Sequence, residues 1–187
     1  MKFVITSMLV TSMFLSACLA STLPKDVYFY FDTDESGPLY MQMGSFHGDP
    51  SQTPIEFKYI HPPKLEYNYL PASLNYMPTY AKFKWGNRET QINYIAEVKL
   101  PDNLAVLLEN LSPQVWLYSQ EEPIEGYTAI TINLTQENEV VISLINSAAG
   151  LNIKTRETIE LARVKGEVLD SPEFIIDSCG CELGNPF

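Results

Sequence analysis

The sequence has little of what catalytic and nucleic-acid-binding sites are usually made of. It contains only two histidines, His47 and His61, and only 12 Lys and Arg against 23 Asp and Glu, for a formal net charge of −11. It has no G-x-S-x-G elbow, no Walker loop and no H-E-x-x-H motif. Without a basic stripe, we expect no nucleic-acid partner. The acidic balance suits a basic protein partner or a cation, and it equally serves solubility.

Long apolar runs are also missing, and the longest one lies at the N-terminus. Residues 3–15 (FVITSMLVTSMFL) follow Lys2 and are too few for a bilayer core, which needs about 20 apolar residues, but they fit the h-region of a signal peptide. Leu15-Ser16-Ala17-Cys18 follows directly and resembles the lipobox of bacterial lipoproteins. Ordinary cleavage after Ala20, behind the small residues of Cys18-Leu19-Ala20, is the alternative.

The lipobox resemblance implies a location. It makes residues 1–17 a signal peptide cut before Cys18, whose thiol would carry diacylglycerol and whose new amine would be acylated. Several acyl chains on one residue give stable anchoring, whereas one chain does not. Residues 18–25 would then be a lipidated tether, and 26–187 one periplasmic domain. Leu19 rather than Asp after the cysteine implies the outer membrane, with the domain facing the periplasm.

Cysteine is scarce, and lipidation of Cys18 would leave two. Cys179 and Cys181 form a C-x-C pair near the C-terminus, in a compartment where disulfides persist. A local disulfide staple is the preferred interpretation. A redox role is the alternative, since strained disulfides are labile, but the thioredoxin-type C-x-x-C spacing in a βαβ setting is absent.

Alternating apolar and polar residues dominate the rest of the chain. They predict strands over residues 26–31, 39–46, 81–85, 92–100, 127–134 and 140–145, and a further strand over 153–164 with a helix over 157–165 as the alternative. Turns are expected at 86–87 and 135–139. Residues 61–80 interleave four prolines with four tyrosines, which predicts an irregular loop because proline cannot donate ladder hydrogen bonds.

One helix is predicted, at about residues 102–111. Pro101 stands near its start, and Leu104, Leu107, Leu108 and Leu111 form an apolar stripe at helical spacing that should face the core. The fold class is therefore α+β, a predominantly antiparallel sheet or sandwich with one short helix.

An acidic string follows the first predicted strand. Asp32-Thr33-Asp34-Glu35-Ser36-Gly37 resembles both the D-x-D opening of haloacid-dehalogenase-type phosphotransferases and the start of a calcium loop. The first needs a parallel βαβ sheet, and the second lacks its twelfth-position Glu, which is Met43 here. An acidic β-turn is the preferred interpretation, and Asp32 with Asp34 remains a weak metal candidate. No cofactor is expected.

Aromatic side chains gather in and after the proline-rich stretch. Two interpretations fit them: an exposed surface that binds a protein partner, or a cover over the core that the loop leaves open. The residues concerned are Tyr67, Tyr69, Tyr76, Tyr80 and Trp85.

From Leu70 to about Gly166, the order of short motifs resembles a family of uncharacterised bacterial lipoproteins. The motifs are Leu70-Pro71, Phe83-Lys84-Trp85, Val98-Lys99-Leu100-Pro101 and Arg163-Val164-Lys165-Gly166. Members of that family are often encoded beside type VI secretion lipase effectors, which implies an immunity protein that neutralises an envelope-targeting toxin and needs no catalytic residues. We therefore expect a non-enzymatic, lipid-anchored periplasmic binding protein. A structural or assembly lipoprotein of the outer membrane and a metal-assisted hydrolase are the alternatives.

Overall fold

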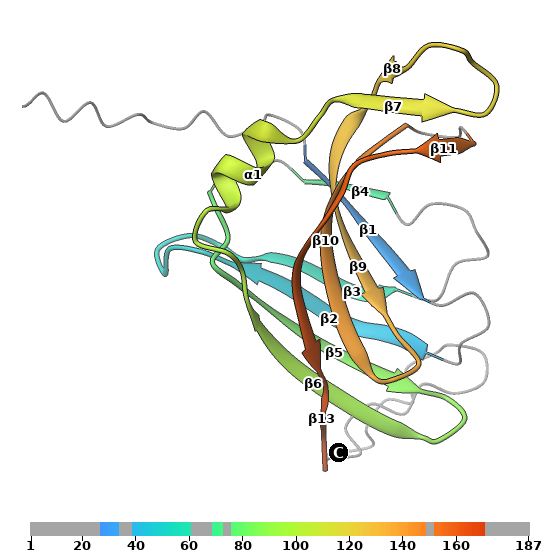
Figure 1. The fold of residues 1–187 in the computed structure, drawn as a ribbon. Coiled ribbons are helices and arrows are strands. Elements are labelled where there is room, and N and C mark those ends of the chain that lie inside the picture. Colours follow the sequence, from blue (N-terminus) through green and yellow to red (C-terminus); the bar gives the residue numbers. More distant parts are fainter. Residues whose placement is uncertain (1–26, 34–38, 61–68, 73–75, 149–151, 171–187) are drawn as a thin grey trace, which may run out of the picture.

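A computed structural model describes residues 27–33, 39–60, 69–72, 76–148 and 152–170 of the chain. Two five-stranded sheets and one three-stranded sheet account for most of them, with a single short helix (Figure 1). The predicted sheet-rich α+β class is confirmed.

The first sheet has the strand order β12-β10-β9-β1-β4. Its strands are β1 (Val27–Thr33), β4 (Tyr69–Ala72), β9 (Tyr127–Leu134), β10 (Glu139–Ser147) and β12 (Thr158–Lys165). The predicted hairpin is β9–β10, while β1 pairs with β9 in parallel. The alternative of a helix over 157–165 is wrong, because Thr158–Lys165 form β12 and pair with β10.

The expected irregular loop over 61–80 is wrong for residues 69–72. These residues form β4, which pairs antiparallel with β1, with Pro71 opposite Tyr28. The strand lies at the edge of the first sheet, where a proline costs least because its missing N–H faces no further strand.

The second sheet has the order β13-β6-β5-β2-β3. Its strands are β2 (Leu39–His47), β3 (Ile55–Ile60), β5 (Tyr80–Asn87), β6 (Ile92–Lys99) and β13 (Glu167–Val168). β3 was not predicted. The turn expected at 86–87 comes slightly later, since Asn87 Oδ1 accepts the N–H of Glu89 (2.9 Å) and of Thr90 (3.1 Å), and Gln91 has a positive φ of 55°.

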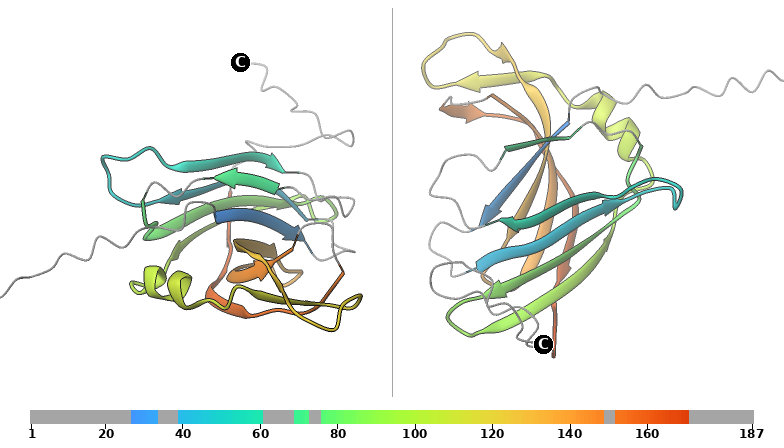
Figure 2. Two further views of the ribbon diagram at one scale, coloured as in Figure 1. Left: turned by 90° about the horizontal axis from the view of Figure 1, so that it is seen from above. Right: turned by 180° about the vertical axis from the view of Figure 1, so that it is seen from behind.

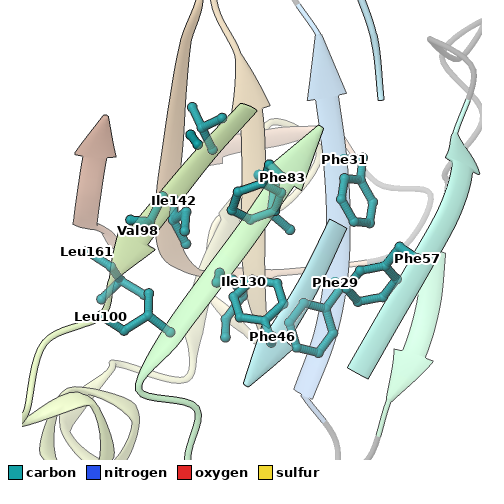
Figure 3. Packing of buried hydrophobic residues seen from close by; sticks show 14 of the residues in the cluster. Phe29, Phe31, Phe46, Phe57, Phe83, Val98, Leu100, Ile130, Ile142 and Leu161 are labelled. Atoms are coloured by element: carbon teal, nitrogen blue, oxygen red, sulfur yellow. The ribbon is translucent and has the colours of Figure 1, made fainter. Parts of the chain in front are cut away.

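One hydrophobic core lies between these two sheets, which form a sandwich (Figure 3). Phenylalanines from both sheets meet in it: Phe29 packs at 5.0 Å from Phe46 and 5.2 Å from Phe57, measured between ring centroids. Ile130 and Ile142 add apolar volume from the middle of the first sheet (Figure 3). The apolar residues of the alternating pattern therefore form the inward face of each strand.

The chain passes from the first sheet to the second at Gly166. β12 pairs with β10, whereas β13, which begins one residue after Gly166, pairs with β6. A Cβ at Gly166 would lie 2.4 Å from the indole of Trp85, so only glycine lets the chain cross there. Two of the short motifs that suggested the family resemblance thus contact each other.

The helix and the small sheet lie together at one end of the sandwich (Figures 1 and 2). α1 (Leu104–Asn110) lies within the predicted range and buries Leu104 and Leu108, as its leucine stripe indicated. It leads from β6 toward the small sheet, whose strand order is β11-β7-β8. Its strands are β7 (Gln114–Leu117), β8 (Ile124–Glu125) and β11 (Ile153–Thr155).

Candidate binding surface

The aromatic residues singled out from the sequence do not form one exposed surface. The Trp85 side chain is fully buried and stacks on Tyr94 at 5.6 Å between ring centroids. Tyr76 is also buried: its hydroxyl donates to the Phe46 carbonyl (2.8 Å) and accepts the N–H of Ile55 (3.2 Å). Both side chains belong to the interior, which leaves neither of them for a partner in this fold.

Burial has an electrostatic consequence for Tyr76. Desolvation raises the pKa of its hydroxyl above the ordinary value, so the group stays neutral and keeps both hydrogen bonds. Of the other tyrosines in the set, Tyr69 is placed only through its backbone in β4, and Tyr67 lies outside the described residues.

Tyr80 lies on the outer face of the second sheet, in a polar cluster. Its ring stacks on His47 at 4.7 Å and 2° between planes, and Lys82 Nζ lies 5.6 Å above the ring. Ser45 Oγ is 2.8 Å from His47 Nε2, the geometry of a nucleophile and a base. Ser45, however, is only 4% exposed, and among the described residues no carboxylate bonds to His47. Glu97 holds Lys82 at 3.0 Å and raises the pKa of its amine. The cluster is therefore better explained as packing on the sheet surface.

The remaining predicted site residues lie beyond what the structure places in detail. Cys18, Cys179, Cys181 and Asp34 are outside the described residues, and Asp32 is placed only through the backbone of β1. Among the residues that are described, no three His, Cys, Asp or Glu side chains gather as metal ligands would. No helix in that same part of the chain is long and apolar enough to cross a bilayer.

The small sheet carries the most prominent exposed aromatic residues of the described chain. Its central strand alternates: Val115 and Leu117 are buried against Ala148, while Trp116 is 41% exposed. Tyr118, the first residue after β7, continues this alternation at 68% exposed, and its N–H donates to the Asn152 carbonyl at 3.1 Å, so its backbone stays beside that of β11. Residues two apart on a strand point to the same side. Trp116 and Tyr118 therefore project together from the outer face of this sheet. We call this the Trp116–Tyr118 face.

A buried asparagine fixes the small sheet to the sandwich. Asn146 of β10 is 1% exposed, and its Nδ2 donates to the carbonyls of Ser112 (2.6 Å) and Gln114. Its Oδ1 accepts the N–H of Glu157 (3.1 Å). The side chain thus ties the start of β7 and the link between β11 and β12 to β10.

Two further contacts strengthen this attachment. Glu157 Oε2 accepts the N–H of Ser112 at 2.8 Å, and the N–H of Gly126 donates to the Pro113 carbonyl at 2.7 Å. A Cβ at Gly126 would lie 2.5 Å from the carbonyl oxygen of Ser147, so the backbones approach closely there. The aromatic pair is therefore presented on a fixed support and not on a free loop.

Carboxylates border one side of the Trp116–Tyr118 face. Glu125 lies opposite Gln114 in the pairing of β7 with β8, which places it on the face that Gln114 shares with Trp116. Glu121 and Glu122 are exposed in the connection between these strands. Within the described part of the chain, no ion pair joins any of the three to a cation, in contrast to Glu97, Glu139 and Glu160 on the sandwich.

The sequence does not predict this surface because the β7 pattern is short. Residues 114–118 (QVWLY) do alternate, but Gln114 is the one polar residue among their three outward positions, so the polar phase that marks a strand is weak. Two large aromatic residues in the outward phase of such a strand were the available signal.

The comparisons with known proteins give no relative. No protein-family model, no curated protein and no solved structure matches the chain.

Proposed function

We propose that this chain is a non-enzymatic binding protein of the bacterial envelope, which recognises a protein partner through the Trp116–Tyr118 face. One observation carries the proposal. A tryptophan and a tyrosine project from the outer face of a sheet whose inner face is buried and whose position is fixed by Asn146. Large, rigid aromatic side chains of this kind are enriched among the residues that dominate protein–protein affinity.

The anchoring part of the proposal rests on the sequence. The lipobox-like Leu15-Ser16-Ala17-Cys18 would attach the protein by lipid to the outer membrane, with the domain facing the periplasm. Replacing Cys18 with Ser tests this directly. The variant should leave the membrane fraction and accumulate unprocessed, whereas a variant that stays processed and membrane-bound contradicts the lipid anchor.

The partner that best fits the family resemblance is an envelope-targeting toxin, with this chain acting as its immunity protein. Such a protein needs only affinity, which agrees with a candidate site made of aromatic side chains and not of a nucleophile and its base. On this proposal, a Trp116→Ala/Tyr118→Ala variant present at the wild-type level fails to protect cells from the toxin.

Site-specific crosslinking tests the binding face. A photoreactive phenylalanine analogue would replace Tyr118 in cells that make the full chain, and the same analogue at Val168 serves as the control. Val168 is matched because it is a similarly exposed hydrophobic residue (59%), but it lies in the second sheet. We expect one discrete crosslinked protein from position 118 only, lost when Trp116 is changed to Ala. Equal products from both positions, or none from 118, contradict the proposed face.

A further inference from the structure

We infer that the Trp116–Tyr118 face takes an arginine- or lysine-rich segment of a protein partner. The inference rests on the proposed function and names the chemistry of what that face binds. Its basis is the combination of two aromatic rings with three carboxylates that have no cation beside them.

The aromatic pair itself suits a cation. The face of an indole or phenol ring carries a negative quadrupole, so it attracts guanidinium and ammonium groups as well as apolar surface. Trp116 on β7 and Tyr118 directly after it are both exposed while Leu117 between them is buried, so one extended segment would contact both rings. The planar guanidinium of arginine stacks on such rings while the N–H groups at its edge remain free to donate to carboxylates.

The carboxylates give the face its charge. Some exposed acids of the sandwich have cations beside them: Lys82 lies 3.0 Å from Glu97, and Arg163 lies 2.8 Å from both Glu139 and Glu160. Others, such as Glu89 and Glu167, have no ion pair among the described residues, but the Trp116–Tyr118 face differs in having three such glutamates within residues 121–125. Along the β8 side of the Trp116–Tyr118 face, no such pair occurs among the described residues. This side is therefore left with uncompensated negative charge, carried by Glu121, Glu122 and Glu125.

The charge is also distributed unevenly across the face. The nearest basic residues in the sheet, Lys154 and Arg156, belong to or directly follow β11, which pairs with β7 on the side away from β8. A basic segment would therefore place its cations over the rings and toward β8, and it would be repelled from the β11 side.

The same charges disfavour other occupants of this face. A second copy of the chain would be repelled wherever its glutamates met those of the first, because like charges at an interface oppose association. Anionic lipid headgroups would be repelled as well. Neutral lipid and self-association remain as outcomes that the experiment separates.

The probe is a short synthetic peptide of alternating arginine and serine, labelled with a fluorophore, and a matched peptide with aspartate in place of arginine. Fluorescence anisotropy measures the binding of each to the full chain at low salt. We expect binding of the arginine peptide only, with affinity lowered about tenfold by Trp116→Ala. The triple variant E121Q/E122Q/E125Q should lose a similar factor.

A second triple variant controls for net charge. E89Q/E109Q/E167Q removes the same number of charges from other exposed positions, and it should change the affinity by less than about twofold. Circular dichroism would establish that all variants fold as the wild type does. Equal losses in both triple variants would mean attraction by overall acidity and would overturn the inference, as would equal binding of the aspartate peptide.

The fluorescence emission of Trp116 tests whether neutral lipid or a second copy of the chain occupies the face instead. The chain has two tryptophans, and Trp85 is fully buried, so a shift of the exposed fluorophore reports on this face. A shift caused by neutral phosphatidylcholine vesicles, or by raising the protein concentration alone, would assign the face to lipid or to a second copy and overturn the inference. If Tyr118 still crosslinks one protein while the arginine peptide does not bind, the proposed function stands and the basic partner is wrong.

Discussion

The sandwich and the small sheet are built from the same alternating pattern, but they are stabilised in different ways. The sandwich buries a continuous core to which both large sheets contribute aromatic and branched side chains. Among the described residues, the core of the small sheet consists of Val115 and Leu117 packed with Ala148, with Ile124 and Ile153 partly buried beside them. A sheet this small is not stable in isolation, so it depends on the sandwich for its position.

Because of this dependence, the residues that stabilise the fold and the residues proposed to bind a partner lie in different regions. In the sandwich, nearly every large aromatic side chain packs against its neighbours. Trp85 is fully buried. In the small sheet, hydrogen bonds from Asn146 and Glu157 hold the backbone, which leaves Trp116 and Tyr118 free to project outward. A partner-facing residue can thus change without opening a cavity in the core.

The two tryptophans give the largest and most direct test of this difference. Trp85→Ala should lower the free energy of unfolding by about 3–5 kcal/mol, because it leaves a cavity between Tyr94 and Gly166. Trp116→Ala should change it by no more than about 0.5 kcal/mol. Urea denaturation followed by circular dichroism measures both. Similar losses for the two variants would contradict the separation of core and binding face.

The attachment of the small sheet is the next test. Asn146→Ala should cost about 2–3 kcal/mol locally, since it leaves the carbonyls of Ser112 and Gln114 and the N–H of Glu157 without their partner. Hydrogen exchange should accelerate in β7 and change little in the middle of β9. Asn152→Ala, at an exposed asparagine near β11, is the control. Uniform acceleration throughout the chain would mean that Asn146 supports the whole fold and not the small sheet alone.

Substitutions at two glycines test how closely the chain packs in the small sheet and in the sandwich. Gly126→Ala should cost about 1–3 kcal/mol, because its Cβ would meet the backbone carbonyl of Ser147 at 2.5 Å. Gly44→Ala should cost less, because its nearest neighbour is the Phe83 ring at 3.1 Å, which would need to shift by only a few tenths of an ångström. Thermal unfolding of the two variants ranks them, and a larger loss at Gly44 would contradict this prediction.

The sequence predicted the sandwich better than the small sheet for a physical reason. Strands such as β6 and β9 have one face in the core and one in water, so their alternation is visible over eight residues each. β4 was hidden by Pro71, which is tolerated only because the strand is an edge. β7 was hidden because Trp116 and Tyr118 occupy its exposed side.

The candidate binding face could not be predicted because exposure is a property of three-dimensional packing. Tyr76 and Trp85 are as aromatic as Trp116 and Tyr118, and no feature of their local sequence states which pair is buried. The role of Asn146 could not be predicted either, because its three hydrogen-bond partners lie 11 to 34 positions away in the sequence. The helix was predictable because its leucine stripe is local.

The smallest expected effect concerns pH and comes from the sandwich. Arg163 donates to Glu160 (2.8 Å) and to Glu139 (2.8 Å), and the hydrogen bond to Arg163 lowers the pKa of the Glu160 carboxyl below its ordinary 4.5. A carboxyl whose pKa is lower in the folded state stabilises the fold above its unfolded pKa. That contribution is lost as the pH falls through the folded value.

Unfolding free energies of wild type and Glu160→Gln, measured at low salt from about pH 6 to about pH 3, test this. The wild type should be the more stable at the upper end, and the gap should close below 4.5, where the wild-type carboxyl becomes protonated and resembles the amide. Glu125→Gln is the matched control in the small sheet, because no ion pair within the described residues holds Glu125. If the gap for Glu160→Gln does not close in acid, or if Glu125→Gln shows the same closing, the ion pairs of the sandwich do not distinguish the two regions.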